Sequence, residues 1–267
     1  MYFVLGGTGF VGSAVCRFLE ASGESHVTIT RTNYNDWMGR SCETFVNCAG
    51  NARKFWSNLH PYDDFVASVE LAVRSLHDFR YSQYVQISTV DVYEHPEDFH
   101  QTAEETPIQP SRLSVYGFHK WLAEIVVQHY ARNWLILRLG GLVGQGLKKN
   151  PVFDVVNGIP LRLTADSELG FVDVADVARI VRDLVRLGVQ NETYNVCGTG
   201  SIQMSELARL AERPVIFGPD REKQFYRISN NKLSKLFPLP SSRDAAADFI
   251  SNWKAGATGV TSDAIRQ

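Results

Sequence analysis

The stretch VLGGTGFVGSAVCRFLE, residues 4–20, places several glycines where an apolar strand runs directly into a helical pattern. Three of them form the pattern G-x-x-G-x-x-G. Glycine permits a tight turn after a strand, a close approach of the backbone to a ligand, and near contact of helix with sheet. The free N–H groups at the start of the helix favour negative charge. We therefore expect a pyrophosphate-binding turn formed by Gly6, Thr8, Gly9, Phe10, Val11 and Gly12.

Apolar runs along the chain alternate between short β-branched segments and longer segments of helical period, which is typical of parallel βαβ units. Strands are expected at 2–5, 26–30, 44–48, 84–88, 135–139 and 171–172. Helices are expected near 10–22, 62–80, 112–132, 173–187 and 203–211. The pattern predicts an α/β protein with a Rossmann-type, doubly wound parallel sheet.

The strand and helix pattern loosens after residue 146, where Pro151, Gly158 and Pro160 interrupt it. It weakens again beyond Gly200. We expect these parts to build a smaller C-terminal lobe over the carboxyl edge of the sheet, where open α/β sheets bind their ligands. The predicted dinucleotide-binding domain is 1–146 with 171–194, and the predicted substrate lobe is 147–170 with 195–267.

Composition excludes several classes of partner. The net charge is −2 and the isoelectric point is near 6.4, so nothing attracts the chain broadly to nucleic acid or to an anionic membrane surface. No apolar run approaches the length of about 20 residues that spans a bilayer. The four cysteines lack metal-ligand spacing, and no leader pattern precedes the first strand. We therefore expect a cytoplasmic protein without a metal site.

Six motifs occur in one order along residues 2–212: GGTGFVG, VNCAG, ISTVDVY, YGFHK, LRLGGLVG and FVDVADVA. In order and approximate spacing they resemble the extended short-chain dehydrogenase/reductases, in particular the nucleotide-sugar epimerase, dehydratase and reductase group. The resemblance implies an oxidoreductase of the Rossmann type that binds NAD(P). It also implies that Cys48, Ala49 and Gly50 lie against the cofactor.

Tyr116 is the only tyrosine with a lysine four residues later, Lys120, and the sequence between them is helical in character. Residues four apart share a helix face, so the ammonium can lie near the phenol. A nearby cation favours the phenolate, which makes the phenol an acid/base for a carbinol or a carbonyl. The alternative is a surface tyrosine and lysine that share a helix by accident.

Ser88 and Thr89 end an apolar strand, so a hydroxyl there would project at the carboxyl edge of the sheet. The resemblance implies that Thr89 hydrogen-bonds the substrate oxygen beside Tyr116, with Ser88 as the second choice and Asp91 nearby. It also implies that Lys120 holds the nicotinamide ribose. The structural alternative for both hydroxyls is the capping of backbone groups.

The residue after the second strand distinguishes the two cofactor forms, because an acid binds a free 2′-hydroxyl and an arginine accommodates a 2′-phosphate. Arg31 occupies this place, and no acid follows until Asp36. We therefore favour NADP over NAD, the alternative being a solvated arginine. Too few residues separate Arg31 from FVNCAG for the usual helix and strand, so the sheet is expected to lack one edge strand.

The resemblance also narrows the reaction. Sugar dehydratases of the group carry two adjacent acids after the hydroxyl residue, whereas this chain has Val90 and then Asp91. Epimerases that invert carbons beside a ketone use a further Cys/His-type pair, and His119 is expected to face elsewhere. A reductase of a 4-keto nucleotide sugar is favoured, with a 4-epimerase as the alternative. Its phosphates are expected at Lys149, Asn150 and Arg227, since guanidinium offers paired donors.

Two further alternatives keep the same fold. One is a non-catalytic NADP-binding sensor or assembly protein, since fold does not dictate chemistry. The other is a reductase of a non-sugar ketone, which would need an apolar pocket. The resemblance also implies a homodimer that pairs through the helices expected at 62–80 and 112–132.

Overall fold

The computed structural model describes residues 1–256, except for the side chains of Pro219 and Asp220. The chain divides into two compact units. Unit 1 comprises Met1–Glu94, Glu105–Leu139 and Ala175–Tyr194. Unit 2 comprises, within the described residues, His95–Glu104, Gly140–Val174 and 195–256. Residues 257–267 of the predicted substrate lobe lie outside the described residues.

Unit 1 is built on a six-stranded sheet with the order β10-β5-β4-β3-β1-β2. Its strands are β1 Tyr2–Leu5, β2 His26–Ile29, β3 Ser41–Asn47, β4 Arg80–Thr89, β5 Trp134–Leu139 and β10 Glu192–Val196. Each pairing among β1 to β5 is parallel. Leu5 is in register with Asn47, and Asn47 with Gln86. The segments that follow β1, β3 and β4 therefore begin at the same edge of the sheet.

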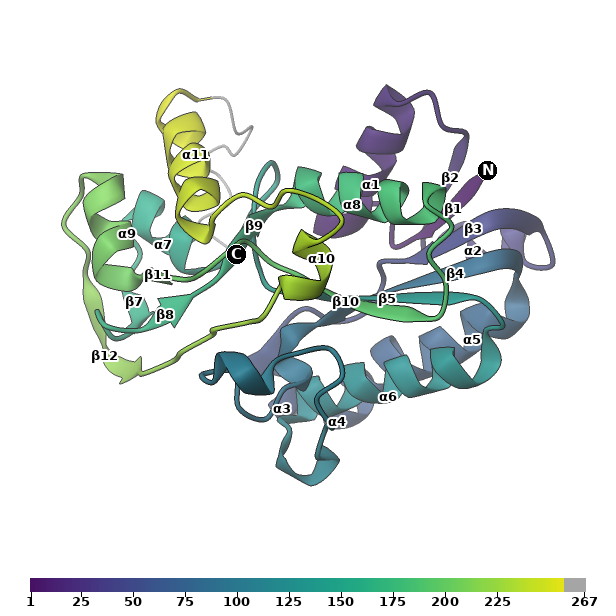
Figure 1. Cartoon of the computed structure of the whole chain (residues 1–267), viewed down its shortest axis with the longest axis horizontal. Coiled ribbons are helices and arrows are strands. Elements are labelled where there is room, and N and C mark those ends of the chain that lie inside the picture. The colour runs from purple at the N-terminus through teal and green to yellow at the C-terminus, as the bar shows by residue number, and fades with distance from the viewer. Residues whose placement is uncertain (257–267) are drawn as a thin grey trace. The chain divides into compact units, whose positions relative to one another are not determined.

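Helices cover both faces of this sheet (Figure 1). α1 Phe10–Ala21 and α8 Val174–Arg186 lie on one face. α5 Leu71–Asp78 and α6 Val115–Tyr130 lie on the other. The doubly wound Rossmann-type fold predicted from the sequence is confirmed.

Aromatic side chains fill the core between the sheet and one helical layer. Phe3, Phe45, Phe79 and Tyr84 are all buried there. The Phe45 and Tyr84 rings stack with centroids 5.2 Å apart. Burial of each such side chain contributes about 1.5–3 kcal/mol to folding, so the core holds the strand ends in fixed positions.

The sheet ends at β2, as the short spacing after Arg31 predicts. Only the four-residue helix α2 Tyr34–Trp37 lies between β2 and β3. The sixth strand of the sheet is β10, which the sequence analysis missed. The segment expected at 171–172 does form a strand, β9 Phe171–Asp173, but it pairs with β6 Gly141–Val143 in a separate sheet. That placement was wrong because a short apolar run does not specify its pairing partner.

The helix expected at 62–80 is divided into three parts. α4 Pro61–Phe65 leads into a π-helical turn, η1 Val66–Glu70, which leads into α5. α3 Lys54–Leu59 precedes them. Single π-helical turns within helices are rare and occur frequently at functional sites. Short 3₁₀ turns complete this part of the description: η2 Val90–Val92, η3 Phe99–Gln101 and η4 Pro110–Arg112.

Unit 2 contains three two-stranded sheets, β11-β8, β12-β7 and β6-β9. Its other strands are β7 Leu161–Leu163, β8 Glu168–Leu169, β11 Ile202–Gln203 and β12 Phe217–Glu222. Its helices are α7 Pro151–Asn157, α9 Met204–Ala211, α10 Asn231–Ser234 and α11 Ser242–Lys254. The Ser241 hydroxyl caps α11 by accepting a hydrogen bond from Asp244 N at 3.0 Å.

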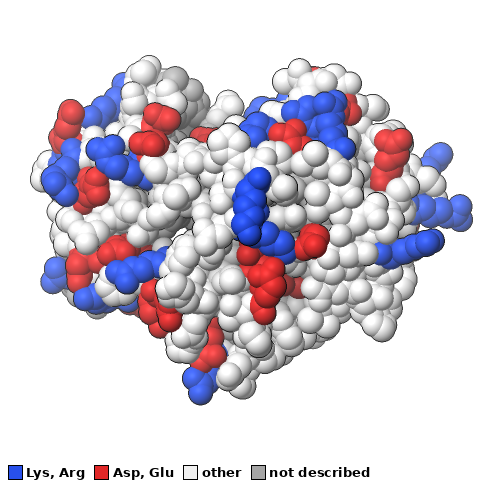
Figure 2. Space-filling view, in the orientation of Figure 1, with Lys and Arg blue, Asp and Glu red and all other residues white. Residues whose placement is uncertain are grey.

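Acidic and basic side chains lie interspersed on the face that Figure 2 shows, rather than gathered in one patch. This distribution agrees with the net charge of −2. Within residues 1–256, none of the helices has both the length and the hydropathy of a membrane span.

Candidate active site

The glycine turn after β1 has no room for a side chain at Gly6 or Gly12. A Cβ at Gly12 would lie 2.3 Å from Gly6 O, and one at Gly6 would lie 2.9 Å from the Ala49 backbone. Gly6 adopts a φ of +75°, which glycine accepts at little cost. Gly9 is the N-cap of α1 and offers no side chain to cap the first N–H groups of that helix. Such a cradle of backbone donors fits the pyrophosphate of a dinucleotide.

The segment after β3 forms a second wall at the same edge of the sheet. Cys48 N donates to Leu5 O at 2.9 Å, and the Asn47 side chain accepts a hydrogen bond from Ala49 N at 3.0 Å. Gly50 follows with a φ of +122°. Burial raises the pKa of the Cys48 thiol, so this cysteine stays protonated. Cys48 therefore belongs to this wall as a neutral thiol.

Arg31 begins the turn after β2 and is exposed. The Asn33 side chain holds this turn: it accepts from Thr30 N at 2.7 Å and donates to Thr28 O at 3.0 Å. The guanidinium therefore projects from a turn whose backbone is fixed at both ends.

Tyr116 and Lys120 lie one turn apart at the start of α6, which the Ser114 hydroxyl caps through Gly117 N at 3.2 Å. Lys120 Nζ is 5.9 Å from the centroid of the Tyr116 ring. A Cβ at Gly50 would lie 3.0 Å from that ammonium, so the wall after β3 closes over it. Burial lowers the pKa of Lys120, and the Asp64 carboxylate is the largest opposing influence.

Thr89 ends β4 next to Asp91. Thr89 Oγ1 donates to Asp91 Oδ2 at 3.2 Å and accepts from Asp91 N at 3.2 Å. A Cβ at Gly117 would lie 2.2 Å from Asp91 O, so α6 starts in direct contact with the segment after β4. This contact places Tyr116 and Thr89 on adjoining segments of unit 1. Asp91 Oδ1 in turn accepts from Lys54 Nζ at 2.7 Å.

Ser88 has a different environment from Thr89, because successive residues of a strand point to opposite faces. Its hydroxyl donates to the buried carboxylate of Glu124. Arg138 binds the same carboxylate at 2.7 Å and the Tyr93 hydroxyl at 2.9 Å. Ser88 is thus one member of a buried polar network that joins β4, β5 and α6. Thr89 is the hydroxyl at the edge of the sheet.

The predicted substrate residues Lys149, Asn150 and Arg227 belong to unit 2. Lys149 is exposed. The Asn150 side chain caps α7 by accepting from Phe153 N at 2.8 Å, and its amide donates to Leu142 O at 2.7 Å. Arg227 binds Glu168 through two nitrogens, at 2.9 and 3.1 Å. Hydrogen bonding to Arg227 lowers the pKa of Glu168, so the carboxylate stays charged.

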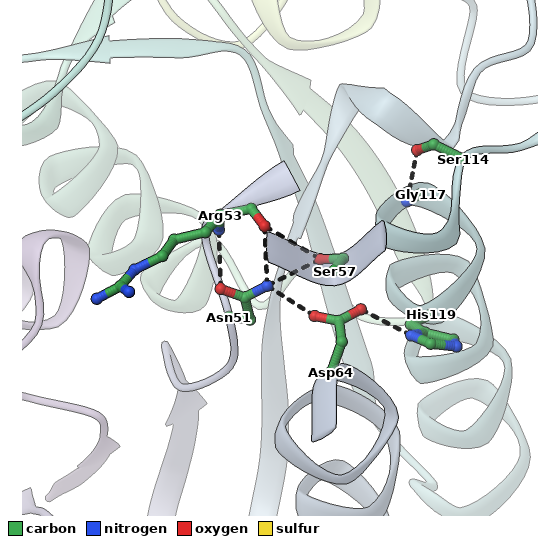
Figure 3. A network of polar contacts seen from close by, with 7 residues as sticks. All are labelled: Asn51, Arg53, Ser57, Asp64, Ser114, Gly117 and His119. Atoms are coloured by element: carbon green, nitrogen blue, oxygen red, sulfur yellow. Dashed lines mark hydrogen bonds and ion pairs between the residues drawn. The ribbon is translucent and has the colours of Figure 1, made fainter. Parts of the chain in front are cut away.

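A polar network that no sequence pattern predicted lies beside α6 (Figure 3). Asp64 is fully buried; it accepts from Asn51 Nδ2 at 2.8 Å and lies 2.7 Å from His119 Nδ1. Asn51 Nδ2 also donates to Ser57 Oγ at 2.8 Å. An acid after Pro61 is an ordinary helix-start signal, so no local pattern indicates that Asp64 is buried. His119 faces Asp64.

The sequence model of the NAD dependent epimerase/dehydratase family matches residues 2–197. This range includes the glycine turn and all the site residues of unit 1 described above. No curated protein matches the chain in sequence.

Solved structures share the fold over nearly the whole chain. RMD from Pseudomonas aeruginosa in complex with NADPH has a TM-score of 0.77 and 17% identity, covering 96% of this chain and 99% of that one. A dTDP-4-dehydrorhamnose reductase from Clostridium acetobutylicum has a TM-score of 0.77 and 17% identity, with coverages of 95% and 99%. A Thermus thermophilus UDP-glucose 4-epimerase in complex with NAD has a TM-score of 0.76 and 18% identity, with coverages of 95% and 98%.

Proposed function

Because the chain belongs to the NAD dependent epimerase/dehydratase family, we propose that it is an NADP-dependent reductase of a 4-keto nucleotide sugar. One observation carries the proposal. Thr89 and the Tyr116–Lys120 pair lie on adjoining segments at the same sheet edge as the glycine turn, and Lys120 is buried beneath Gly50. A dinucleotide site and an acid/base pair at one edge are what carbonyl reduction requires.

Each residue of the site has a role in this reaction. The nicotinamide, when bound, supplies the hydride. Tyr116 delivers the proton to the carbonyl oxygen, and the Lys120 ammonium favours the phenolate that remains. Thr89 orients that oxygen with its hydroxyl. Lys120 also binds the nicotinamide ribose, and Cys48, Ala49 and Gly50 line the cofactor.

Arg31 supports the choice of NADP. It is exposed on a turn that Asn33 fixes, where a guanidinium can bind a 2′-phosphate with paired donors. The similar folds of Pseudomonas RMD and of the Thermus epimerase are found with NADPH and NAD respectively. The preference of this chain therefore depends on its own residues at this turn.

We assign the binding of the substrate phosphates to unit 2, at Lys149, Asn150 and Arg227. The Arg227 fork already binds a carboxylate, Glu168, which is the geometry that it would offer to a phosphate. Exchange of that carboxylate for the substrate diphosphate is part of this proposal.

We also retain the homodimer that the sequence resemblance implies, with α6 and the segment from α4 to α5 as its interface.

A 4-epimerase is the second candidate, supported by the similar fold of the Thermus UDP-glucose 4-epimerase. It needs the same tyrosine and threonine, but it must return the hydride to the opposite face of the sugar. A non-catalytic NADP sensor would need only the cofactor site. Net consumption of NADPH distinguishes the reductase from both.

The test begins with fluorescence titration of NADPH and NADH into the wild-type protein, Arg31→Ala and the control Arg40→Ala, an exposed arginine elsewhere in unit 1. Arg31→Ala should weaken NADPH binding about tenfold or more and leave NADH binding unchanged. A panel of 4-keto nucleotide sugars is then added to the NADPH complex.

NADPH oxidation that Tyr116→Phe abolishes would support the reductase. Interconversion of UDP-glucose and UDP-galactose by the NAD⁺ or NADP⁺ complex, with no net change in the redox state of the cofactor, would support the epimerase instead. Cofactor binding with neither reaction would favour the sensor.

A further inference from the structure

The ion pair of Lys54 and Asp91 lies directly beside the proposed catalytic hydroxyl. Lys54 Nζ donates to Asp91 Oδ1 at 2.7 Å, and the other carboxylate oxygen accepts from Thr89 Oγ1 at 3.2 Å. The two side chains retain 39% and 19% of their exposure. A pair this exposed contributes little to stability, so its position calls for another explanation.

Buried groups fix the turn that carries Lys54 (Figure 3). The Asn51 side chain accepts from Arg53 N at 2.8 Å and donates to Asp64 Oδ1 at 2.8 Å. Asp64 is anchored in turn by His119 on the catalytic helix. Lys54 is the next residue after Arg53 and begins α3. Its backbone is thus ordered on folding, which lowers the entropic cost of holding the ammonium beside Asp91 when a substrate binds.

We propose that Lys54, together with Asp91, binds the hydroxyl group on the carbon next to the one at which Thr89 and Tyr116 act. This inference rests on the proposed function and names a feature of its substrate. In a pyranose that reacts at C4, the neighbouring carbons are C3, which carries a hydroxyl, and C5, which carries C6. The group in question is therefore the 3-hydroxyl of the nucleotide sugar.

The chemistry of the pair favours a hydroxyl over an anion. A hydroxyl both donates and accepts, so it can donate to the Asp91 carboxylate and accept from the Lys54 ammonium. A carboxylate or phosphate at the same place would meet the negative charge of Asp91 at close range. Because the partners are charged, loss of the hydroxyl should weaken binding more than loss of a neutral hydrogen bond would.

The experiment measures binding without turnover, in protein that carries Tyr116→Phe and is saturated with NADP⁺. Calorimetric titrations compare UDP-glucose and dTDP-glucose with their 3-deoxy analogues. The same titrations are repeated with Lys54→Met added, and with Arg53→Met added as a control. Arg53 precedes Lys54, and its side chain is exposed. Thermal unfolding of each variant checks that it is folded.

The 3-deoxy sugar should bind about tenfold to one-hundredfold more weakly than its parent. With Lys54→Met this ratio should fall to about twofold or less, and with Arg53→Met it should be unchanged. Equal ratios with and without Lys54 would overturn the inference and leave the proposed function standing. Binding of NADP⁺ without binding of any of these nucleotide sugars would remove the proposed substrate class, and the inference with it.

Discussion

Gly12 leaves no room for a side chain, since a Cβ there would lie 2.3 Å from Gly6 O. Gly12→Ala must push α1 away from the turn that precedes it. We expect the free energy of unfolding to fall by about 1–3 kcal/mol. NADPH binding should weaken about tenfold or more, because the N–H groups of the turn and the helix no longer converge. Urea denaturation and fluorescence titration measure the two effects.

Gly170→Ala is the matched control for this substitution. An added Cβ there would meet nothing closer than 3.5 Å, which is ordinary contact. The free energy of unfolding of Gly170→Ala should differ from that of the wild type by no more than about 0.5 kcal/mol, and NADPH binding should be unaffected. Wild-type NADPH affinity in Gly12→Ala would contradict the assignment of the turn to the cofactor.

Ser68 presents an unusual buried hydroxyl on the π-helical turn η1. Within residues 1–256, its Oγ has no hydrogen-bond partner. Ser75, also buried, donates to Ala72 O at 3.0 Å and lies 2.7 Å from the Tyr84 hydroxyl. Ser68→Ala should therefore raise the free energy of unfolding by up to about 1 kcal/mol, whereas Ser75→Ala should lower it by about 1–2 kcal/mol. Equal losses in urea denaturation would contradict this difference.

The residue types and their spacing in the sequence predicted some of the candidate site residues but not the others. Tyr116 and Lys120 could be proposed because their spacing fixes them on one helix face. Thr89 ranked ahead of Ser88 only through the family resemblance. The strand supplies a physical reason, because its alternation sends Ser88 to Glu124. Lys54 and Asp64 escaped notice because their partners Asp91 and His119 are distant in sequence. Pairings of that kind depend on tertiary packing, which no local pattern encodes.

At the scale of the elements, helix α7 carries Asp154, a carboxyl group whose pKa is raised in the folded protein. Burial raises the pKa of Asp154 to about 6, and Arg162 opposes this. The folded protein therefore retains a proton that the unfolded chain releases near pH 4, so the free energy of unfolding falls as the pH rises from about 4 to 6. Asp154→Asn should abolish this dependence. It should raise stability by about 1–3 kcal/mol at pH 7.5 and have no effect below about pH 4.

Urea denaturation between pH 4 and 8 measures this prediction, with Asp166→Asn as the control. Hydrogen bonding to Lys223 lowers the pKa of Asp166, so its contribution has the opposite sign. That substitution should not stabilise the protein at pH 7.5. A pH profile for Asp154→Asn parallel to that of the wild type would show that the carboxyl titrates normally.

The elements themselves were predictable where the period was long. The helices at the glycine turn and at Tyr116 agree closely with α1 and α6, because many residues contribute to each pattern. β9 was expected in the main sheet and β10 was not expected at all. Strands of a few residues do not show which sheet they join. The π-helical turn within 62–80 was also invisible, because one extra residue in a helical turn scarcely alters the apolar period.

At the scale of the whole molecule, we assign the cofactor to unit 1 and the phosphates of the sugar nucleotide to unit 2, and hydrogen exchange can test this division. NADPH should protect amides of 6–12, of 48–50 and of the first turn of α6, all in unit 1. UDP-glucose added to the NADP⁺ complex should add protection around Asn150 and Arg227. At one hundred times its Kd, NADPH should also stabilise the fold it binds by about 2.7 kcal/mol. Protection by NADPH confined to unit 2 would contradict the assignment, because the glycine turn would then have no part in binding the cofactor.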